Sequence, residues 1–135
     1  TDNENTPTID FNVVSSSGDE SVSAKAITVD LSGPSSEIIT VDFAVTGTAT
    51  GTGTDYTLLN GTLSIPAGDT TGTITIANIV DDTTDESDET VIVTLSSPNN
   101  ATLGSDDVHT YTIVDNDNQL IIVIDNCVRV NVIAS

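Results

Sequence analysis

Short runs with apolar residues at every second position recur along the chain, separated by stretches rich in Gly, Ser, Thr, Asp, Asn and Pro. A period of two places alternate side chains on one face of a β-strand, and no segment shows the period of a helix. The clearest alternation lies in Ile9 to Val13, Val41 to Val45, Ile74 to Ile76, Val91 to Leu95 and His109 to Ile113. The pattern predicts an all-β domain of about seven short strands, packed as an antiparallel β-sandwich.

One predicted strand, Val22 to Leu31, changes its phase between Ala26 and Ile27, and this change predicts a β-bulge there. The preceding stretch Ser15 to Ser21 is rich in Ser, Gly and Asp and is not counted among the seven strands.

The chain divides into three parts. Residues 1–8 are polar and read as a flexible lead-in, and residues 9–118 hold the sandwich. Residues 119–135 form a tail with two apolar runs, Leu120 to Ile124 and Val128 to Ile133. The tail is expected to be either a hairpin packed on the domain or a strand that leaves it and pairs with a neighbour.

Charge narrows the range of partners. The 135 residues include 21 acidic side chains against one Lys and one Arg, which gives a net charge of -19. Without a basic surface to neutralise phosphates, nucleic acids and anionic membrane surfaces are excluded as partners. No apolar run approaches the length needed for membrane insertion. Cations are the natural partners of such a chain.

Catalytic chemistry finds little support. The single histidine, His109, is in phase with the apolar positions of its strand and is expected at the border of the core. The single cysteine, Cys127, lies in the apolar tail without a neighbouring histidine, so an internal disulfide is impossible and a catalytic thiol is not expected. We therefore expect no enzyme activity.

The acidic side chains concentrate in one segment. Residues 81–89 hold six carboxylates between two predicted strands, and their mutual repulsion favours a cation that compensates it. Ca²⁺ takes six to eight oxygen ligands in flexible geometry, which suits such a segment. The segment from Asp115 to Asn118 begins like an EF-hand loop, but Leu120 stands where the motif needs Gly and Asn126 where it needs Glu.

The order of several motifs resembles the Calx-β domain family, from about Ile9 to Asp117. The first half of the resemblance consists of Gly47-Thr48-Ala49, Gly53-Thr54-Asp55-Tyr56 and Gly61-Thr62-Leu63-Ser64-Ile65. The second half consists of Val80-Asp81-Asp82, then Glu86, Glu89-Thr90-Val91, Val93-Thr94-Leu95-Ser96 and Ile113-Val114-Asp115-Asn116-Asp117. The resemblance implies an immunoglobulin- or fibronectin-like sandwich whose loops hold calcium at one end.

Carried over by position, the resemblance implies a set of calcium ligands drawn from four segments. They are Glu20, Asp55, Asp81, Asp82, Glu86, Glu89, Asp115 and Asp117, with the backbone carbonyl of Thr84. Asn116 and Thr83 stand where the calcium-rich members carry acids, so fewer ions or weaker binding are expected.

Two functions follow from these observations. The first is a calcium-binding structural or adhesive module at the cell surface or outside the cell, whose partners are calcium ions and neighbouring modules or copies of itself. The second is a subunit of an extracellular filament that assembles by β-strand addition through a terminal segment, either residues 119–135 or residues 1–9.

Overall fold

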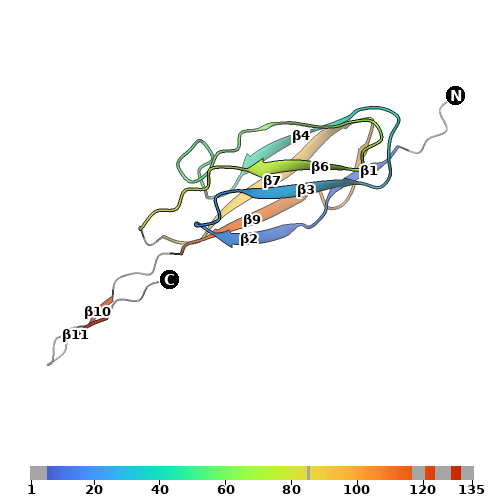
Figure 1. Ribbon diagram of the computed structural model, residues 1–135. Coiled ribbons are helices and arrows are strands. Elements are labelled where there is room, and N and C mark those ends of the chain that lie inside the picture. The colour runs from blue at the N-terminus through green and yellow to red at the C-terminus, as the bar shows by residue number, and fades with distance from the viewer. Residues whose placement is uncertain (1–5, 85, 117–120, 124–128, 132–135) are drawn as a thin grey trace.

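Two β-sheets form the body of the computed structural model, which describes residues 6–84, 86–116, 121–123 and 129–131. The four-stranded sheet has the order β6-β3-β1-β8, and the five-stranded sheet has the order β2-β9-β7-β4-β5. Figure 1 shows the two sheets face to face, as in a sandwich. The described residues form no helix, and hence none that could cross a membrane. The prediction of an all-β sandwich is confirmed.

The strands are short, and most of them end at a turn residue or a loop. Those of the four-stranded sheet are β1 (Thr8–Phe11), β3 (Lys25–Leu31), β6 (Thr71–Ile76) and β8 (Thr102–Leu103). Those of the five-stranded sheet are β2 (Ser15–Asp19), β4 (Ile39–Thr46), β5 (Gly61–Ile65), β7 (Glu89–Asn99) and β9 (Val108–Val114). The count exceeds the predicted seven because β2 and β8 are polar or very short, so no alternation marks them.

The predicted bulge in the third strand is wrong. β3 begins only at Lys25 and pairs with β6 in an unbroken antiparallel register. Ile27 and Val29 face the core, whereas Val22 lies before the strand and is exposed. The change of phase in the sequence therefore marks the place where a loop becomes a strand.

The largest correction concerns β2, since residues 15–19 form a strand that the sequence pattern does not show. β2 runs parallel to β9, with Ser15 opposite Thr110 and Asp19 opposite Val114. Its side chains are polar because it is an edge strand, so pairing with β9 rather than burial of an apolar face holds it.

The alternation of the first run also breaks at this point. Ile9 and Phe11 of β1 are buried, but Val13 is 52% exposed. The chain leaves the four-stranded sheet after β1 and enters the five-stranded sheet at β2, and Val13 lies in this crossover. The lead-in is shorter than eight residues, because Thr8 already pairs with Thr102 and the N–H of Thr102 donates to the carbonyl of Pro7 (3.0 Å).

The core between the sheets consists mainly of Ile and Val, whose branched side chains suit strands. Two tyrosines complete it, each fitted against a glycine. A Cβ on Gly18 of β2 would lie 2.4 Å from the hydroxyl oxygen of Tyr111, and one on Gly51 would lie 2.7 Å from the ring of Tyr56. The two glycines therefore leave the space that the side chains of Tyr111 and Tyr56 occupy.

His109 is buried, with 1% of its surface exposed, and both ring nitrogens have partners. Nδ1 donates to the carbonyl of Val13 (2.7 Å), since a carbonyl can only accept, and Nε2 forms a hydrogen bond with the Ser16 hydroxyl (2.7 Å). The ring also packs against Phe11. His109 thus fastens the crossover and β2 to β9, which agrees with the structural role predicted for it.

The tail contains two short strands, β10 (Ile121–Val123) and β11 (Arg129–Asn131), paired antiparallel. Within the described ranges they form a two-stranded sheet that is not hydrogen bonded to either sheet of the sandwich. In Figure 1 this hairpin stands beyond the end at which β9 terminates. Cys127 lies outside the described residues.

Candidate metal centre

Acidic residues from distant parts of the sequence meet at the end of the sandwich where β2 and β9 terminate. Because β2 runs parallel to β9, it delivers Glu20, the residue after its last position, to the same end as Val114 (the Glu20 N–H donates to the Val114 carbonyl, 3.1 Å). Asp82 and Glu86 come from the loop between β6 and β7. An antiparallel strand in place of β2 would have carried Glu20 to the opposite end.

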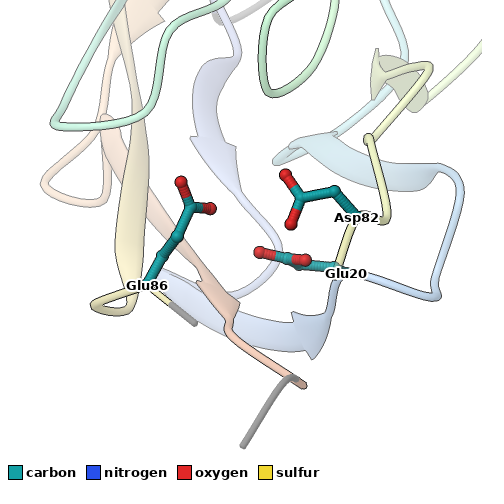
Figure 2. A group of neighbouring side chains, drawn as sticks. All are labelled: Glu20, Asp82 and Glu86. Atoms are coloured by element: carbon teal, nitrogen blue, oxygen red, sulfur yellow. The ribbon is translucent and has the colours of Figure 1, made fainter. Parts of the chain in front are cut away.

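Glu20, Asp82 and Glu86 each present a carboxylate oxygen to one point, as Figure 2 shows. These three oxygens all lie within 4.8 Å of one another. Oxygens bound to one Ca²⁺ at about 2.3–2.6 Å can be at most about 5 Å apart. The spacing is therefore compatible with three ligands of a single calcium ion.

Glu20 is the unusual member of the group, since only 5% of its surface is exposed. Its Oε2 atom is buried and has no hydrogen-bond partner among the described residues. Burial, with the charges of Asp82, Asp115 and Glu86, raises the pKa of Glu20 from 4.5 to about 7, although a hydrogen bond from the backbone of Asp82 opposes this. A buried carboxylate with an unpaired oxygen is stabilised only by a proton or a cation.

The acidic surface continues from this group to Glu89, the first residue of β7. Burial raises the pKa of Glu89, and the charges of Asp55, Glu86 and Asp82 raise it further. Asp55 is held in its loop, where Oδ2 accepts the N–H of Thr50 (2.6 Å) and the backbone carbonyl accepts the N–H of Val80 (2.8 Å). The charges of Asp55, Asp82 and Glu86 thus act on Glu89, so these acids gather at the same end of the sandwich.

Asp115 connects the acidic loop to the end of β9. Its Oδ2 atom accepts the N–H of Glu86 (3.0 Å), and its own N–H donates to Oδ1 of Asp88 (3.1 Å). Asp115 thus fixes the backbone from which the Glu86 side chain projects. Asp88 is an exposed loop residue, and its Oδ1 atom helps to order this connection by accepting the Asp115 N–H.

The predicted ligands differ in how the structure places them. Glu20, Asp82 and Glu86 form the compact group, while Glu89, Asp55 and Asp115 adjoin it. Asp81 is exposed and lies outside the group. The backbone N–H of Thr84 donates a hydrogen bond to Oδ1 of Asp82 (2.9 Å). Asp117 lies outside the described residues. All nine remain predictions as ligands, and the geometry favours the first three.

Asn116 offers a buried side-chain oxygen that the sequence does not reveal. Its Oδ1 atom is buried and, among the described residues, has no hydrogen-bond partner. An amide oxygen is an ordinary calcium ligand, so exchange of an acid for Asn removes charge from this end of the sandwich but keeps an oxygen. Only burial identifies this atom, and burial is not visible in the sequence.

Comparison with known proteins places the chain in a family. The Calx-beta domain model matches residues 2–117, so the chain belongs to the Calx-beta domain family. The apo-form Calx CBD1 domain is 26% identical with a TM-score of 0.74, over 84% of this chain and 100% of that one. The calcium binding domain CBD12 of CALX1.1 is 27% identical with a TM-score of 0.72, over 81% of this chain.

The chain spans 44% of that CBD12 structure, which is longer. The Calx CBD2 domain, at 15% identity and a TM-score of 0.69 over 78% of this chain and 85% of that one, shares the fold. A search of curated proteins gave no match. Calcium, the predicted cofactor, is confirmed for the family, and the described carboxylates form a cluster that fits the ion.

Proposed function

We propose that this chain binds calcium at the end of the sandwich where Glu20, Asp82 and Glu86 meet, and that the ion completes the fold there. The observation that carries the proposal is the buried Oε2 atom of Glu20, which lacks a partner among the described residues. Solvated loop acids would leave no such atom, because water would satisfy them.

The energetics support a structural role for the ion. Without it, the Glu20 carboxylate is buried without compensation and repelled by its neighbours, and its raised pKa reflects first the burial and then the repulsion. An ion that binds the folded chain and not the unfolded one stabilises the fold, by about 4 kcal/mol at a thousandfold excess over Kd. Calcium therefore stiffens the loops that carry its ligands.

Thermal unfolding in millimolar calcium, against excess chelator, tests this proposal. We expect calcium to raise Tm by about 10–20 °C, because about 4 kcal/mol acts on a domain of this size. Magnesium at the same concentration is the control and is expected to act weakly, since it requires a smaller octahedral site. Equal Tm values in calcium and chelator, with no heat of binding on titration, would contradict the proposal.

The setting that we propose for the module is extracellular or at the cell surface, with a structural or adhesive role. A net charge of -19 with a single Lys and a single Arg suits a salt-rich exterior, and a calcium-stiffened domain transmits force better than a loose one. Fractionation of the source cells, with an antibody against the sandwich, tests this location; recovery with the cytosol alone would contradict it.

A second candidate function is a filament subunit that assembles through its tail. It is favoured by β10 and β11, which in the described part of the chain form a sheet of their own without hydrogen bonds to the sandwich. An isolated two-stranded sheet is marginally stable, so these strands need a further partner. Removal of residues 119–135 is expected to abolish assembly measured by light scattering, and unchanged monomers before and after removal would contradict it.

A further inference from the structure

Three exposed valines mark one corner of the sandwich. Val13 is 52% exposed, Val14 47% and Val108 39%. They are neighbours, because the Val13 carbonyl accepts from His109, the residue after Val108, and the Val14 carbonyl accepts the N–H of Thr110 (2.9 Å). We call these three residues the valine corner; it lies where β2 and β9 begin. Clustered exposed apolar side chains indicate an interaction surface.

The valine corner opens onto an unprotected sheet edge. β2 is the outermost strand of its sheet and, among the described strands, pairs only with β9. Its sequence, Ser-Ser-Ser-Gly-Asp, contains no Pro and no Lys, the residues that commonly protect an edge, and its one charge is the last residue, Asp19. Such an edge offers free backbone groups to an added strand, and the valine corner beside it offers an apolar surface for the side chains of that strand.

The tail supplies a segment of matching chemistry. β10 carries three apolar residues in succession, Ile121 to Val123, so both faces of the strand are apolar. A two-stranded sheet cannot cover both faces, and an outside surface is needed. The charges of residues 119–135 also cancel, Asp125 against Arg129, so the net charge of -19 belongs to the rest of the chain. The tail therefore carries no net charge that an acidic sandwich would repel.

The direction of β9 separates the tail from the valine corner. β9 begins at Val108, in the corner, and ends at Val114, at the end of the sandwich that holds Glu20. Figure 1 accordingly shows β10 and β11 beyond the end of β9, away from its start. Contact between the tail of one copy and the corner of the next is head-to-tail, and a head-to-tail contact that does not close repeats as an open filament.

Charge adds to the match. Asp106 and Asp107 immediately precede Val108, and Asp106 is exposed. β11 begins with Arg129, the single arginine of the chain. An acidic rim beside an apolar corner therefore faces a partner with one basic residue and several apolar ones, which favours one register of docking.

We propose that the open edge of β2, with the valine corner and the acidic pair Asp106 and Asp107, receives the β10–β11 hairpin of a second copy of this chain. The proposal rests on the filament function above and names its acceptor surface. The hairpin adds beside β2 and extends the five-stranded sheet, while its Ile and Val side chains cover the three valines.

Sedimentation velocity of the full chain in millimolar calcium, over a wide range of concentrations, tests the proposal. Replacement of Val13, Val14 and Val108 together by Ser is expected to raise the concentration of half-assembly at least about tenfold, since apolar area buried at the contact is lost. The matched control replaces Ile38 and Leu59 by Ser; both are exposed apolar residues outside the corner and outside β2, and assembly should change less than about twofold.

A charge exchange tests the register without disturbing the valines. Arg129→Glu is expected to weaken assembly, and Asp106→Lys with Asp107→Lys in the same chain is expected to restore it. Hydrogen exchange on the unaltered chain is an independent readout: backbone amides of β2 should exchange more slowly at assembling concentrations than in the monomer.

The outcomes separate the two proposals. If removal of the tail abolishes assembly but the valine and charge variants assemble like the original chain, the acceptor surface is wrong and the filament function stands. If the chain is monomeric at every concentration, both fail. Tail-dependent protection of β2 in a monomer would show that the hairpin folds back on its own domain, and this too overturns docking between copies.

Discussion

Glu20 and His109 are the two buried polar or charged residues in the described part of the sandwich, and they differ in whether their polar atoms have hydrogen-bond partners. His109 has a partner for each ring nitrogen, at 2.7 Å, and rests against Phe11. Glu20 leaves Oε2 without a partner among the described residues and has its pKa raised to about 7. A satisfied buried group holds a fold together, whereas an unsatisfied one lowers stability until a ligand arrives.

The contrast has a common structural cause. β2 lies against β9, with Ser16 bonded to His109 near its start and Glu20 following its end. The histidine holds the start of the strand, whereas Glu20 follows its other end and is held there by its own backbone hydrogen bond to Val114. A substitution at His109 should therefore lower stability, and a substitution at Glu20 should lower calcium affinity.

The largest effect is expected for His109→Ala. The variant loses two buried hydrogen bonds and leaves a cavity beside Phe11, so the free energy of unfolding should fall by about 4 kcal/mol. The fall should be equal in calcium and in chelator, as measured by urea unfolding. A loss confined to the calcium-bound state would show that His109 belongs to the ion site.

Glu20→Gln should lower calcium affinity rather than the stability of the calcium-free chain. The amide keeps the shape of the side chain but removes the charge, so calcium affinity measured by calorimetry should fall at least about a hundredfold, or about 2.7 kcal/mol. In chelator the variant should be slightly more stable than the original chain, because the repulsion is relieved. Asp69→Asn, in an exposed turn, is the matched control and should leave affinity unchanged.

Gly18→Ala probes the strand that links the two groups. The added Cβ would lie 2.4 Å from the Tyr111 hydroxyl, so β2 must shift away from β9, at a cost of about 2 kcal/mol. Calcium binding should weaken as well, because the shift moves Glu20. Gly33→Ala is the control, since no atom lies within 4 Å of its Cβ position, and a similar loss of stability there would refute this explanation.

The smallest effect concerns pH in the absence of calcium. The pKa of Glu20 is about 7 in the folded chain and 4.5 when unperturbed, so between these values the folded state binds more protons than the unfolded one. Stability should therefore fall as pH rises from 4.5 to 7, by about 1 kcal/mol after allowance for screening by water. Urea unfolding of Glu20→Gln should lack this part of the slope; identical slopes in both chains would contradict the assignment to Glu20.

Much of the fold was predictable from the sequence. Alternation located β1, β4, β6, β7 and β9, because a period of two survives wherever one face of a strand is buried. The acidic run of residues 81–89 and the motif order indicated the calcium-binding family and the end of the sandwich. The charge of -19 by itself predicts against anionic partners, because phosphate binding requires basic side chains.

Only the tertiary structure decided the features that govern the chemistry. β2 has no apolar face, so its pairing with β9 is a long-range contact that local pattern does not encode. That pairing buries Glu20, for which the resemblance implies a ligand role but no burial, and it satisfies His109 and exposes Val13, although the alternation places His109 at the core border and Val13 in phase with buried residues. Periodicity reports which face of a strand is apolar; which strand lies beside it, and which polar atom is left without a partner, depends on packing between distant segments.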